Sequence, residues 1–213
     1  MVDDKTAEEF AVYMKKFQDF YASLAQIVRQ HSSSSHALIV DLGAGPGLLS
    51  VEILKQIPNA TVIGIDPLTK MLVLAKENTR EVSSRRFEVI QGVSENIPLK
   101  NNSVDAIVSR FSLPYWKPPE QSFLEMWRVL KPGGKVILEA LNREFPAWKL
   151  WLIKIHMLVN WAGRNVTKYH VDAYRLAHTM KQVEELFIHA GFGVLEKQGK
   201  KNEWRFIIVA EKK

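Results

Sequence analysis

The stretch Val40–Ser50, VDLGAGPGLLS, decides the fold of this chain. The apolar run Ala37–Val40 leads into it and predicts a strand that ends at the acid Asp41. Three glycines follow at alternate positions: Gly43, Gly45 and Gly47. A helical pattern begins behind them. A strand, a tight glycine turn and a helix N-terminus form a nucleotide-binding unit, because glycine lets the backbone approach the ligand and free helix N–H groups face it.

The spacing of the glycines discriminates between the ligands that such a loop holds. A phosphate-binding P-loop has a lysine after its last glycine, whereas Leu48 follows Gly47 here. A dinucleotide loop has the spacing Gly-x-Gly-x-x-Gly, and its last position, counted from Gly43, falls on Leu48. The pattern that remains is acid-x-Gly-x-Gly-x-Gly. Besides a phosphate and a dinucleotide, the third class of ligand that such a loop can hold is a sulfonium nucleoside.

Strand-like and helical segments alternate around this loop. Apolar strand-like runs lie at 37–41, 61–66, 87–91, 104–110 and 135–140. Helical patterns lie between them at 48–57, 68–80 and 119–130. The turn Lys131–Gly134 (KPGG) predicts the end of the last helix. This alternation predicts a parallel sheet with helices on both faces.

Further segments flank the alternating part. A capping box at Thr6–Glu9 and apolar residues at helical spacing predict one N-terminal helix over 6–30. The alternation stops after residue 141, and we expect a helical cap over about 142–178. A helix at 179–190 follows. The strand-like runs 192–197 and 204–211, joined by a polar turn, predict a terminal antiparallel hairpin.

Length and composition limit the classes of protein. A chain of 213 residues fits one domain over 1–213. It has no cysteine, which excludes disulfides, thiolate metal sites and cysteine nucleophiles. Its first residues, MVDDK, do not resemble a signal peptide, so we expect a cytoplasmic protein. The net charge of +6 favours an anionic partner, although ordinary surface lysines also produce such a value.

The motif Asp41–Gly47 (DLGAGPG) resembles the first motif of the class I S-adenosylmethionine (SAM) methyltransferases, and the chain resembles their small-molecule, ubiquinone and menaquinone methyltransferase-like group. The resemblance implies an α/β fold, a Rossmann-like doubly wound sheet in the order 3-2-1-4-5-7-6 with its last strand antiparallel. It implies SAM as the cofactor and S-adenosylhomocysteine (SAH) as its product. In the family this loop wraps the methionine end of SAM, which assigns to the cofactor Asp41, Gly43, Ala44, Gly45 and Gly47.

The second predicted strand ends in Asp66, 23 residues after Gly43. A carboxylate at this place can accept hydrogen bonds from both ribose hydroxyls, as in the dinucleotide-binding fold. Asp66 and Pro67 resemble the ribose-binding position of the family, and Asp66 can also be the N-cap of the next helix. Met71, one turn into that helix, is assigned to the adenine, with a place in the core as the alternative.

The segment Gln91–Pro98 (QGVSENIP) resembles the family's Gly-Asp-Ala-Glu-x-Leu-Pro stretch, which reads the adenine edge. Val93 stands where the family usually has Asp. The carboxylate that would accept from the adenine amino group is therefore absent, and Ser94 or Glu95 is expected to compensate. We assign the whole region to the adenine: Gly92, Val93, Ser94 and Glu95.

The fourth predicted strand ends at Ser109 and Arg110, and the loop FSLPYW over 111–116 follows. In the family this loop runs beneath the sulfonium and meets the methyl acceptor. We therefore assign Ser109 and Arg110 to the cofactor. The side chains of the loop that we assign to the acceptor are Phe111, Tyr115 and Trp116.

Methyl transfer is a displacement in which the cofactor carries the reactive group and the protein supplies position and electrostatics. A carbon or hydroxyl nucleophile usually also needs a base, and histidine suits proton transfer near neutral pH. Tyr169 and His170, two polar aromatics in a loop-like stretch, are our catalytic candidates. Further acceptor-side candidates are Tyr13, Phe17, Tyr21, His156, Tyr174 and His178. The histidine spacing predicts no metal site.

The most unusual stretch is Phe145–Trp161, FPAWKLWLIKIHMLVNW. Six apolar residues fall on one helical face: Trp148, Trp151, Leu152, Ile155, Leu158 and Val159. The stretch is short for a transmembrane helix and contains Lys149 and Lys154. Three interpretations stay open: a lid over an apolar acceptor pocket, a dimer surface, and a helix that contacts a membrane peripherally.

Three hypotheses about function follow. The first is a SAM-dependent methyltransferase, monomer or homodimer, that acts on a small, apolar or aromatic acceptor. The second is methylation of nucleic acid or protein, supported only by the basic charge; no appended basic domain is apparent, and we expect no nucleic-acid partner. The third is a non-catalytic SAM-binding module. This hypothesis is allowed because Val93 replaces the Asp that the family usually has in the adenine-binding segment. The sequence does not specify the acceptor atom.

Overall fold

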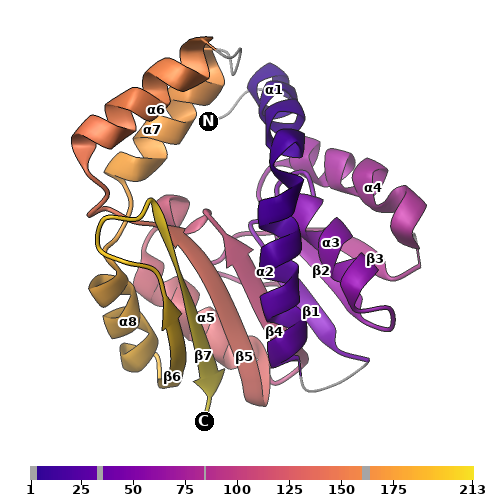
Figure 1. Ribbon diagram of the computed structural model, residues 1–213. Coiled ribbons are helices and arrows are strands. Elements are labelled where there is room, and N and C mark those ends of the chain that lie inside the picture. Colours follow the sequence, from indigo (N-terminus) through magenta and orange to yellow (C-terminus); the bar gives the residue numbers. More distant parts are fainter. Residues whose placement is uncertain (1–3, 33–35, 84, 160–163) are drawn as a thin grey trace.

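The computed structural model describes residues 4–32, 36–83, 85–159 and 164–213, without the side chains of 4, 5, 83, 164, 165 and 169. In these ranges one sheet has the strand order β3-β2-β1-β4-β5-β7-β6 (Figure 1). Its strands are Leu38–Leu42 (β1), Thr61–Asp66 (β2), Phe87–Gln91 (β3), Val104–Arg110 (β4), Leu130–Leu141 (β5), Phe192–Gln198 (β6) and Arg205–Lys212 (β7). β1 to β5 pair in parallel, and β7 runs antiparallel to both β5 and β6. The strand order and the antiparallel last strand are confirmed.

Helices cover both faces of the sheet, as the alternation predicts. Successive strand residues point to opposite faces, so Ile39 belongs to one apolar core and Val40 to the other. The Ile39 side is covered by α2 (Gln18–His31), α3 (Leu48–Gln56) and α4 (Thr69–Ser83). The Val40 side is covered by α5 (Pro119–Val129) and α8 (Met180–His189).

The predicted N-terminal helix over 6–30 is not continuous. α1 (Asp4–Met14) runs into a 3-10 turn, η1 (Lys15–Phe17), and α2 begins at Gln18. Phe17 has φ −115° and ψ 36°, outside the helical region. The break serves packing: Phe10 of α1 packs against the cap, whereas Leu24 of α2 is buried on the sheet. Apolar spacing alone does not reveal such a break, because it continues through it.

The fifth strand is longer than predicted. α5 ends at Val129, as the KPGG turn predicts, but β5 already begins at Leu130. Leu130 pairs with Val104, the register then shifts, and regular pairing resumes between Lys135 and Ala106. The turn-forming residues Lys131–Gly134 therefore lie within β5, where they interrupt its regular pairing with β4. A second 3-10 turn, η2 (Leu113–Tyr115), follows β4.

Two helices, α6 (Ala147–Val159) and α7 (Arg164–Arg175), form a cap beyond β5 (Figure 1). The prediction of a loop around Tyr169 and His170 was wrong, because both lie in α7. Many polar residues in this helix obscure the apolar periodicity in the sequence, but its inner face buries Val166, Ala173 and Tyr174. Among the described helices, none is long and apolar enough to cross a membrane.

Candidate active site

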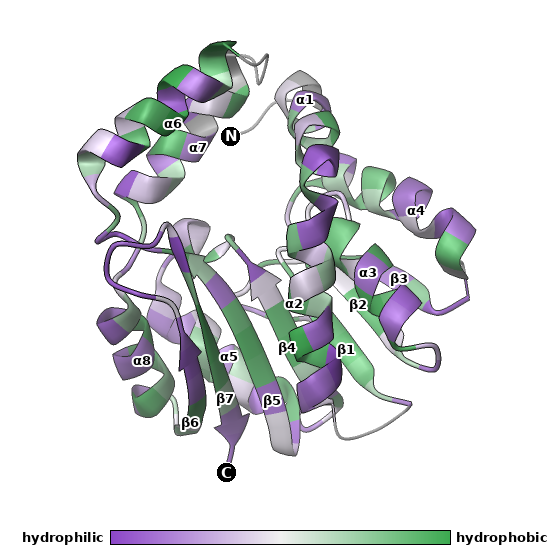
Figure 2. Ribbon diagram, viewed as in Figure 1, coloured by the Kyte–Doolittle hydropathy of each residue, from purple (hydrophilic) through white to green (hydrophobic). Residues whose placement is uncertain are grey.

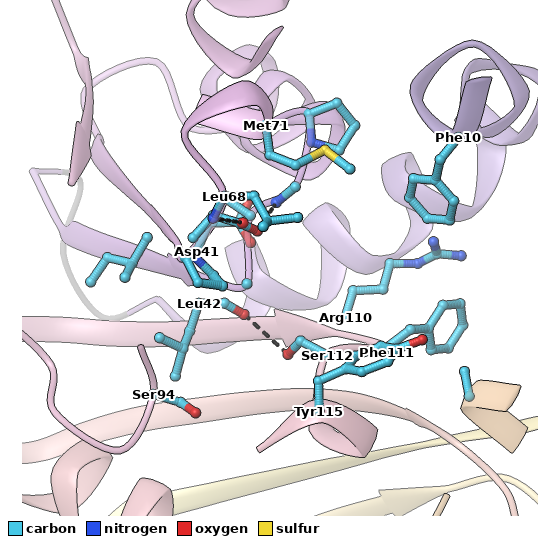
Figure 3. A pocket seen from close by; sticks show the side chains of 18 of the residues that line it. Phe10, Asp41, Leu42, Leu68, Met71, Ser94, Arg110, Phe111, Ser112 and Tyr115 are labelled. Atoms are coloured by element: carbon cyan, nitrogen blue, oxygen red, sulfur yellow. Dashed lines mark hydrogen bonds between the residues drawn. The ribbon is translucent and has the colours of Figure 1, made fainter. Parts of the chain in front are cut away.

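The carboxyl ends of β1, β2 and β4 meet where the strand order reverses, with β1 between β2 and β4. Ligands bind at this place in doubly wound sheets. A cavity of about 700 Å³ opens there, lined from the sheet side by the loops after these strands and from the other side by α1, α2 and α7. Figure 3 shows Asp41, Leu68 and Met71 at one part of the cavity and Phe10, Arg110 and Phe111 at another.

The loop after β1 is held rigidly against β2. The backbone N–H groups of Gly43 and Ala44 both donate to the Ile65 carbonyl oxygen, at 2.8 and 3.0 Å. Gly43 has φ +76°, and a Cβ at this residue would lie 2.5 Å from the Cβ of Ser112. Glycine is therefore required at 43 both by the backbone conformation and by the space beside β4.

Asp66 at the end of β2 connects the loop to the next helix. Its Oδ2 accepts from the Gly45 N–H and its Oδ1 from the Leu68 N–H, each at 2.9 Å. A carboxylate has about four acceptor positions, so each oxygen keeps one for a ligand hydroxyl. Burial raises the pKa of Asp66, which these two backbone hydrogen bonds oppose.

Asp41 is buried at the base of the cavity. Its Oδ2 accepts from the Ser50 hydroxyl at 2.6 Å. Burial raises the pKa of Asp41 to about 6, the hydrogen bond from Ser50 opposes the rise, and the charge of Asp66 adds to it. The carboxyl therefore titrates close to neutrality.

Arg110 places a fixed cation at the end of β4. Its Nε donates to Glu139 Oε2 at 2.5 Å, and Glu139, whose side chain is fully buried, also pairs with Arg205. The guanidinium lies 4.4 Å from the ring centre of Tyr21 and 4.2 Å from that of Phe111. Stacking and ion pairing thus hold Arg110 in one place on the cavity wall.

The region assigned to the adenine forms a chain of polar contacts. Ser122 and Ser94 share a hydroxyl hydrogen bond of 2.9 Å, and the Ser94 hydroxyl contacts Glu95 Oε2 at 3.1 Å. The other oxygen of Glu95 accepts from the Lys117 N–H. Val93 is exposed. Glu95 is therefore a carboxylate on the cavity wall only two residues beyond the position where the family has Asp.

The part of the cavity beside Arg110 is mostly apolar and aromatic. Its lining residues there are Phe10, Met14, Tyr21, Phe111, Leu141, His170 and Ala173. Burial raises the pKa of Tyr21 to about 12, so its phenol is protonated at neutral pH. Burial and the nearby charge of Arg110 lower the pKa of His170 to about 4, so its ring is neutral there.

The structure brings most of the sequence-predicted site residues to one cavity. They are Tyr21, Asp41, Gly43, Ala44, Gly45, Asp66, Pro67, Met71, Gly92, Val93, Ser94, Glu95, Arg110, Phe111, Tyr115, Trp116 and His170. Gly47 and Ser109 stand just behind the wall: Gly47 lies against Ala75 of α4, and the Ser109 hydroxyl donates to the Leu42 carbonyl at 2.6 Å.

Other predicted residues do not line the cavity. Tyr13 packs edge-on against Phe17, with ring centres 5.1 Å apart. Tyr174 packs against His170 from behind, at 5.7 Å between ring centres. His156 is exposed on α6, and His178 follows α7. The side chain of Tyr169 and the residue Trp161 lie outside the described part of the chain.

The interpretation of 145–161 as a lid over the pocket is wrong for α6. No described residue of α6 lines the cavity, and α7 supplies the cap residues instead: Lys168, His170, Asp172 and Ala173. Lys168 and Asp172 were missed by sequence reasoning, although their spacing of four residues places them on one helical face. Phe10 and Met14 were missed because apolar spacing does not tell which face of α1 meets a ligand.

Comparisons with known proteins agree with this geometry. Residues 40–138 match the family described as a methyltransferase domain. The chain is 34% identical over 164 residues to a demethylmenaquinone methyltransferase of Lactobacillus johnsonii, covering 72% of this chain and 66% of that protein. It is 27% identical over 162 residues to a chloroplastic 2-methyl-6-phytyl-1,4-hydroquinone methyltransferase of Spinacia oleracea, covering 75% and 40%. The chain therefore spans less than two thirds of the length of either relative.

A solved structure with a similar fold is also that of a methyltransferase. The crystal structure of a SAM-dependent methyltransferase from Aquifex aeolicus superposes with a TM-score of 0.68, at 18% identity and with 88% of each chain covered. At this identity the similarity supports the fold.

Proposed function

We propose that this chain is a class I SAM-dependent methyltransferase that transfers the methyl group of SAM to a small, apolar or aromatic acceptor. The observation that carries the proposal is that one cavity combines two kinds of wall. The first is the glycine loop with Asp66, and the second is the aromatic surface beside Arg110. SAM is the methyl donor.

The residues present fit SAM. The close approach that Gly43 and Gly45 permit suits the methionine part, and the carboxyl of Asp41 suits its amino group. The two free acceptor positions of Asp66 suit the ribose hydroxyls. For the adenine we propose contacts with Met71 and with the wall from Gly92 to Glu95, where Glu95 takes the place of the missing Asp.

When bound, SAM supplies a methyl group on a positively charged sulfur. The chain's own contribution is position and electrostatics. The rings of Phe10, Tyr21 and Phe111 exclude water from the acceptor and hold it in place. The ring of His170 can accept a hydrogen bond from an acceptor hydroxyl and take its proton as the methyl group is transferred, and the guanidinium of Arg110 lowers the pKa of that hydroxyl by stabilising the oxygen anion.

The names of the two curated relatives support an aromatic acceptor of the quinone or hydroquinone type. The wall around Tyr21 and Phe111 suits such a ring, and Arg110 suits its oxygen. Methylation of nucleic acid or protein stays the second candidate, and a non-catalytic SAM-binding module stays the third. The cytoplasmic location, peripheral membrane contact of 145–161 and the choice between monomer and homodimer stay predictions.

Replacing His170 with glutamine is expected to lower kcat by about 100-fold or more, because a positioned base contributes about 10²- to 10⁴-fold. KM for the acceptor should change much less. His189→Gln on α8 is the matched control, because His189 is exposed and does not line the cavity. Steady-state kinetics with a hydroxylated acceptor measure both variants. Equal kcat values for the two variants would show that His170 is not a general base in the reaction.

SAM affinity is expected to weaken as the pH falls below about 6, where the carboxyl of Asp41 becomes protonated and no longer attracts the amino group of SAM. The dissociation constant should rise by up to about tenfold per pH unit. Titration calorimetry between pH 5 and pH 7.5 measures the slope. Asp41→Asn should bind more weakly at neutral pH and lose most of this slope; a slope unchanged in this variant contradicts the assignment.

The same carboxyl makes folding of the ligand-free protein pH-dependent. The folded state keeps the Asp41 proton up to about pH 6, whereas the unfolded chain releases it near 3.8. The folded state thus binds more protons in this window, so the contribution of this group to stability falls as the pH rises from about 4 to about 6.

The direct test of the proposed function is an assay with methyl-labelled SAM and a panel of hydroquinones, phenols, aromatic amines and thiols. The expected result is label in an extractable aromatic product, with one SAH for each methyl group transferred. Label in RNA or protein alone would favour the second candidate. SAM binding without SAH formation across the panel would favour the third.

A further inference from the structure

The outer side of α6 carries an apolar surface that the described residues of the chain leave exposed. Its members, the α6 apolar face, are Trp148, Trp151, Leu152, Ile155, Leu158 and Val159, with exposed fractions between 39% and 68%. Figure 2 shows α6 as a predominantly hydrophobic helix at the outer edge of the cap. The exposed residues are large, adjacent and include two tryptophans, so the face differs from the scattered apolar residues of an ordinary surface.

Apolar and basic residues occupy separate parts of the surface of α6. At about 100° per residue, the α6 apolar face occupies an arc of about 120°. Lys154 borders it on one side, and His156 and Lys149 border it on the other. The opposite side of the helix packs on the protein through Leu150, Ile153 and Met157. Basic residues therefore flank an apolar stripe, which is the pattern of helices that lie in a membrane interface.

The helix that carries this face has charged residues of one sign. From Phe145 to Val159 the chain contains no Asp or Glu, but it contains Lys149 and Lys154. The chain as a whole has a formal net charge of +6. The lysine of residue 149 lies 5.5 Å from the ring centre of Trp148, so cation and apolar surface are adjacent. Lysines so placed can reach lipid head groups while the apolar side chains enter the bilayer.

We propose that the α6 apolar face docks on an anionic lipid surface, with α6 lying in the plane of the membrane interface. A helix of 13 residues is about 20 Å long, whereas a bilayer core is about 30 Å thick, so α6 is suited to lie on the membrane and not to span it. The tryptophans and leucines enter the boundary between head groups and acyl chains, and Lys149 and Lys154 contact the lipid phosphates.

A second copy of the chain fits this surface less well. In a two-fold dimer the same patch faces itself. The lysines that border the α6 apolar face would then be brought close to those of the partner, and the segment from Phe145 to Val159 offers no carboxylate to pair with them. An anionic lipid surface provides the complementary charge. The proposal does not depend on the methyl-transfer reaction, because it concerns the face of the cap that points away from the cavity.

The test is co-sedimentation of the full chain with lipid vesicles, without SAM or acceptor. Vesicles of phosphatidylcholine with about 30% phosphatidylglycerol should bind the chain at least tenfold more strongly than vesicles of phosphatidylcholine alone. The double variant Trp148→Ser/Trp151→Ser should lose at least tenfold in binding. Lys149→Gln/Lys154→Gln should lose about tenfold on anionic vesicles only. Tryptophan emission of the unaltered chain should shift to the blue on binding.

Matched controls separate this face from the surface in general. Ile188→Ser/Leu195→Ser removes two apolar residues that are 59% and 50% exposed elsewhere, and Lys55→Gln/Lys181→Gln removes two distant exposed charges. Both should bind vesicles almost as the unaltered chain does, and all variants should melt at similar temperatures. Equal binding to both kinds of vesicle, or equal losses in the tryptophan variant and its control, overturns the proposal. So does a dimer that Trp148→Ser/Trp151→Ser converts to a monomer in the absence of vesicle binding.

Discussion

Replacing Gly43 with alanine is expected to abolish measurable SAM binding and to lower the free energy of unfolding by about 2–4 kcal/mol. Alanine must adopt φ +76°, and its Cβ would lie 2.5 Å from the Cβ of Ser112, so the loop or the segment after β4 has to move. The same loop holds Asp66 through the N–H of Gly45. Thermal unfolding and titration calorimetry measure the two losses.

Gly133→Ala is the matched control for this variant. Gly133 has a nearly equal φ of +75°, but the nearest atom to its added Cβ is 3.9 Å away, and it lies far from the cavity residues in the fold. We expect a loss of about 1–2 kcal/mol in stability and no change in SAM affinity. Adding Ser112→Gly to Gly43→Ala should restore part of the lost stability, because it removes the obstructing Cβ. Similar results for Gly43→Ala and Gly133→Ala would contradict the role of the close approach.

Replacing Asp66 with asparagine is expected to weaken SAM binding by about 100-fold, because a hydrogen bond to a charged group is worth about 1.5–3 kcal/mol and two such bonds to the ribose are affected. The amide also turns an NH₂ group toward either the N–H of Gly45 or that of Leu68, where the carboxylate now accepts. The loop therefore loses an internal support as well. Titration calorimetry at neutral pH measures the affinity.

Asp105→Asn provides the same chemical change at the opposite edge of the sheet. Asp105 also accepts from a backbone N–H, that of Leu38 at 2.8 Å, and it pairs with Lys131 at 2.7 Å. It does not line the cavity. We expect a SAM affinity within about twofold of the unaltered chain, since exposed ion pairs contribute little and the ligand is remote. A 100-fold loss in both variants would show that the effect at Asp66 is one of stability alone.

The sheet and the glycine loop were predictable because their signals are local. The acid and glycines of Asp41–Gly47 and the strand-end Asp66 lie in segments whose spacing is set by one βαβ unit. Parallel strands bring their carboxyl ends to the same edge, so the meeting of Asp66 with Gly45 and of Arg110 with Glu139 follows from the strand order once that order is known.

The cap was much less predictable because its packing depends on contacts that are distant in sequence. His170 reaches the cavity and Tyr174 lies behind it, yet both are aromatic residues on the same polar helix. Phe10 and Tyr13 share one amphipathic pattern, and only the packing of α1 on the cap places Phe10 at the cavity wall. The outward orientation of the α6 apolar face was equally hidden, since apolar periodicity indicates a face without telling what covers it.

The proposed function requires that the cavity at the ends of β1, β2 and β4 binds SAM. The most direct measurement is titration calorimetry of the full chain with SAM and SAH at neutral pH. We expect one molecule of either ligand to bind per chain, with an affinity that Asp66→Asn weakens about 100-fold and Asp105→Asn changes by no more than about twofold. Absence of heat from binding at millimolar SAM and SAH, with the protein folded, would contradict it.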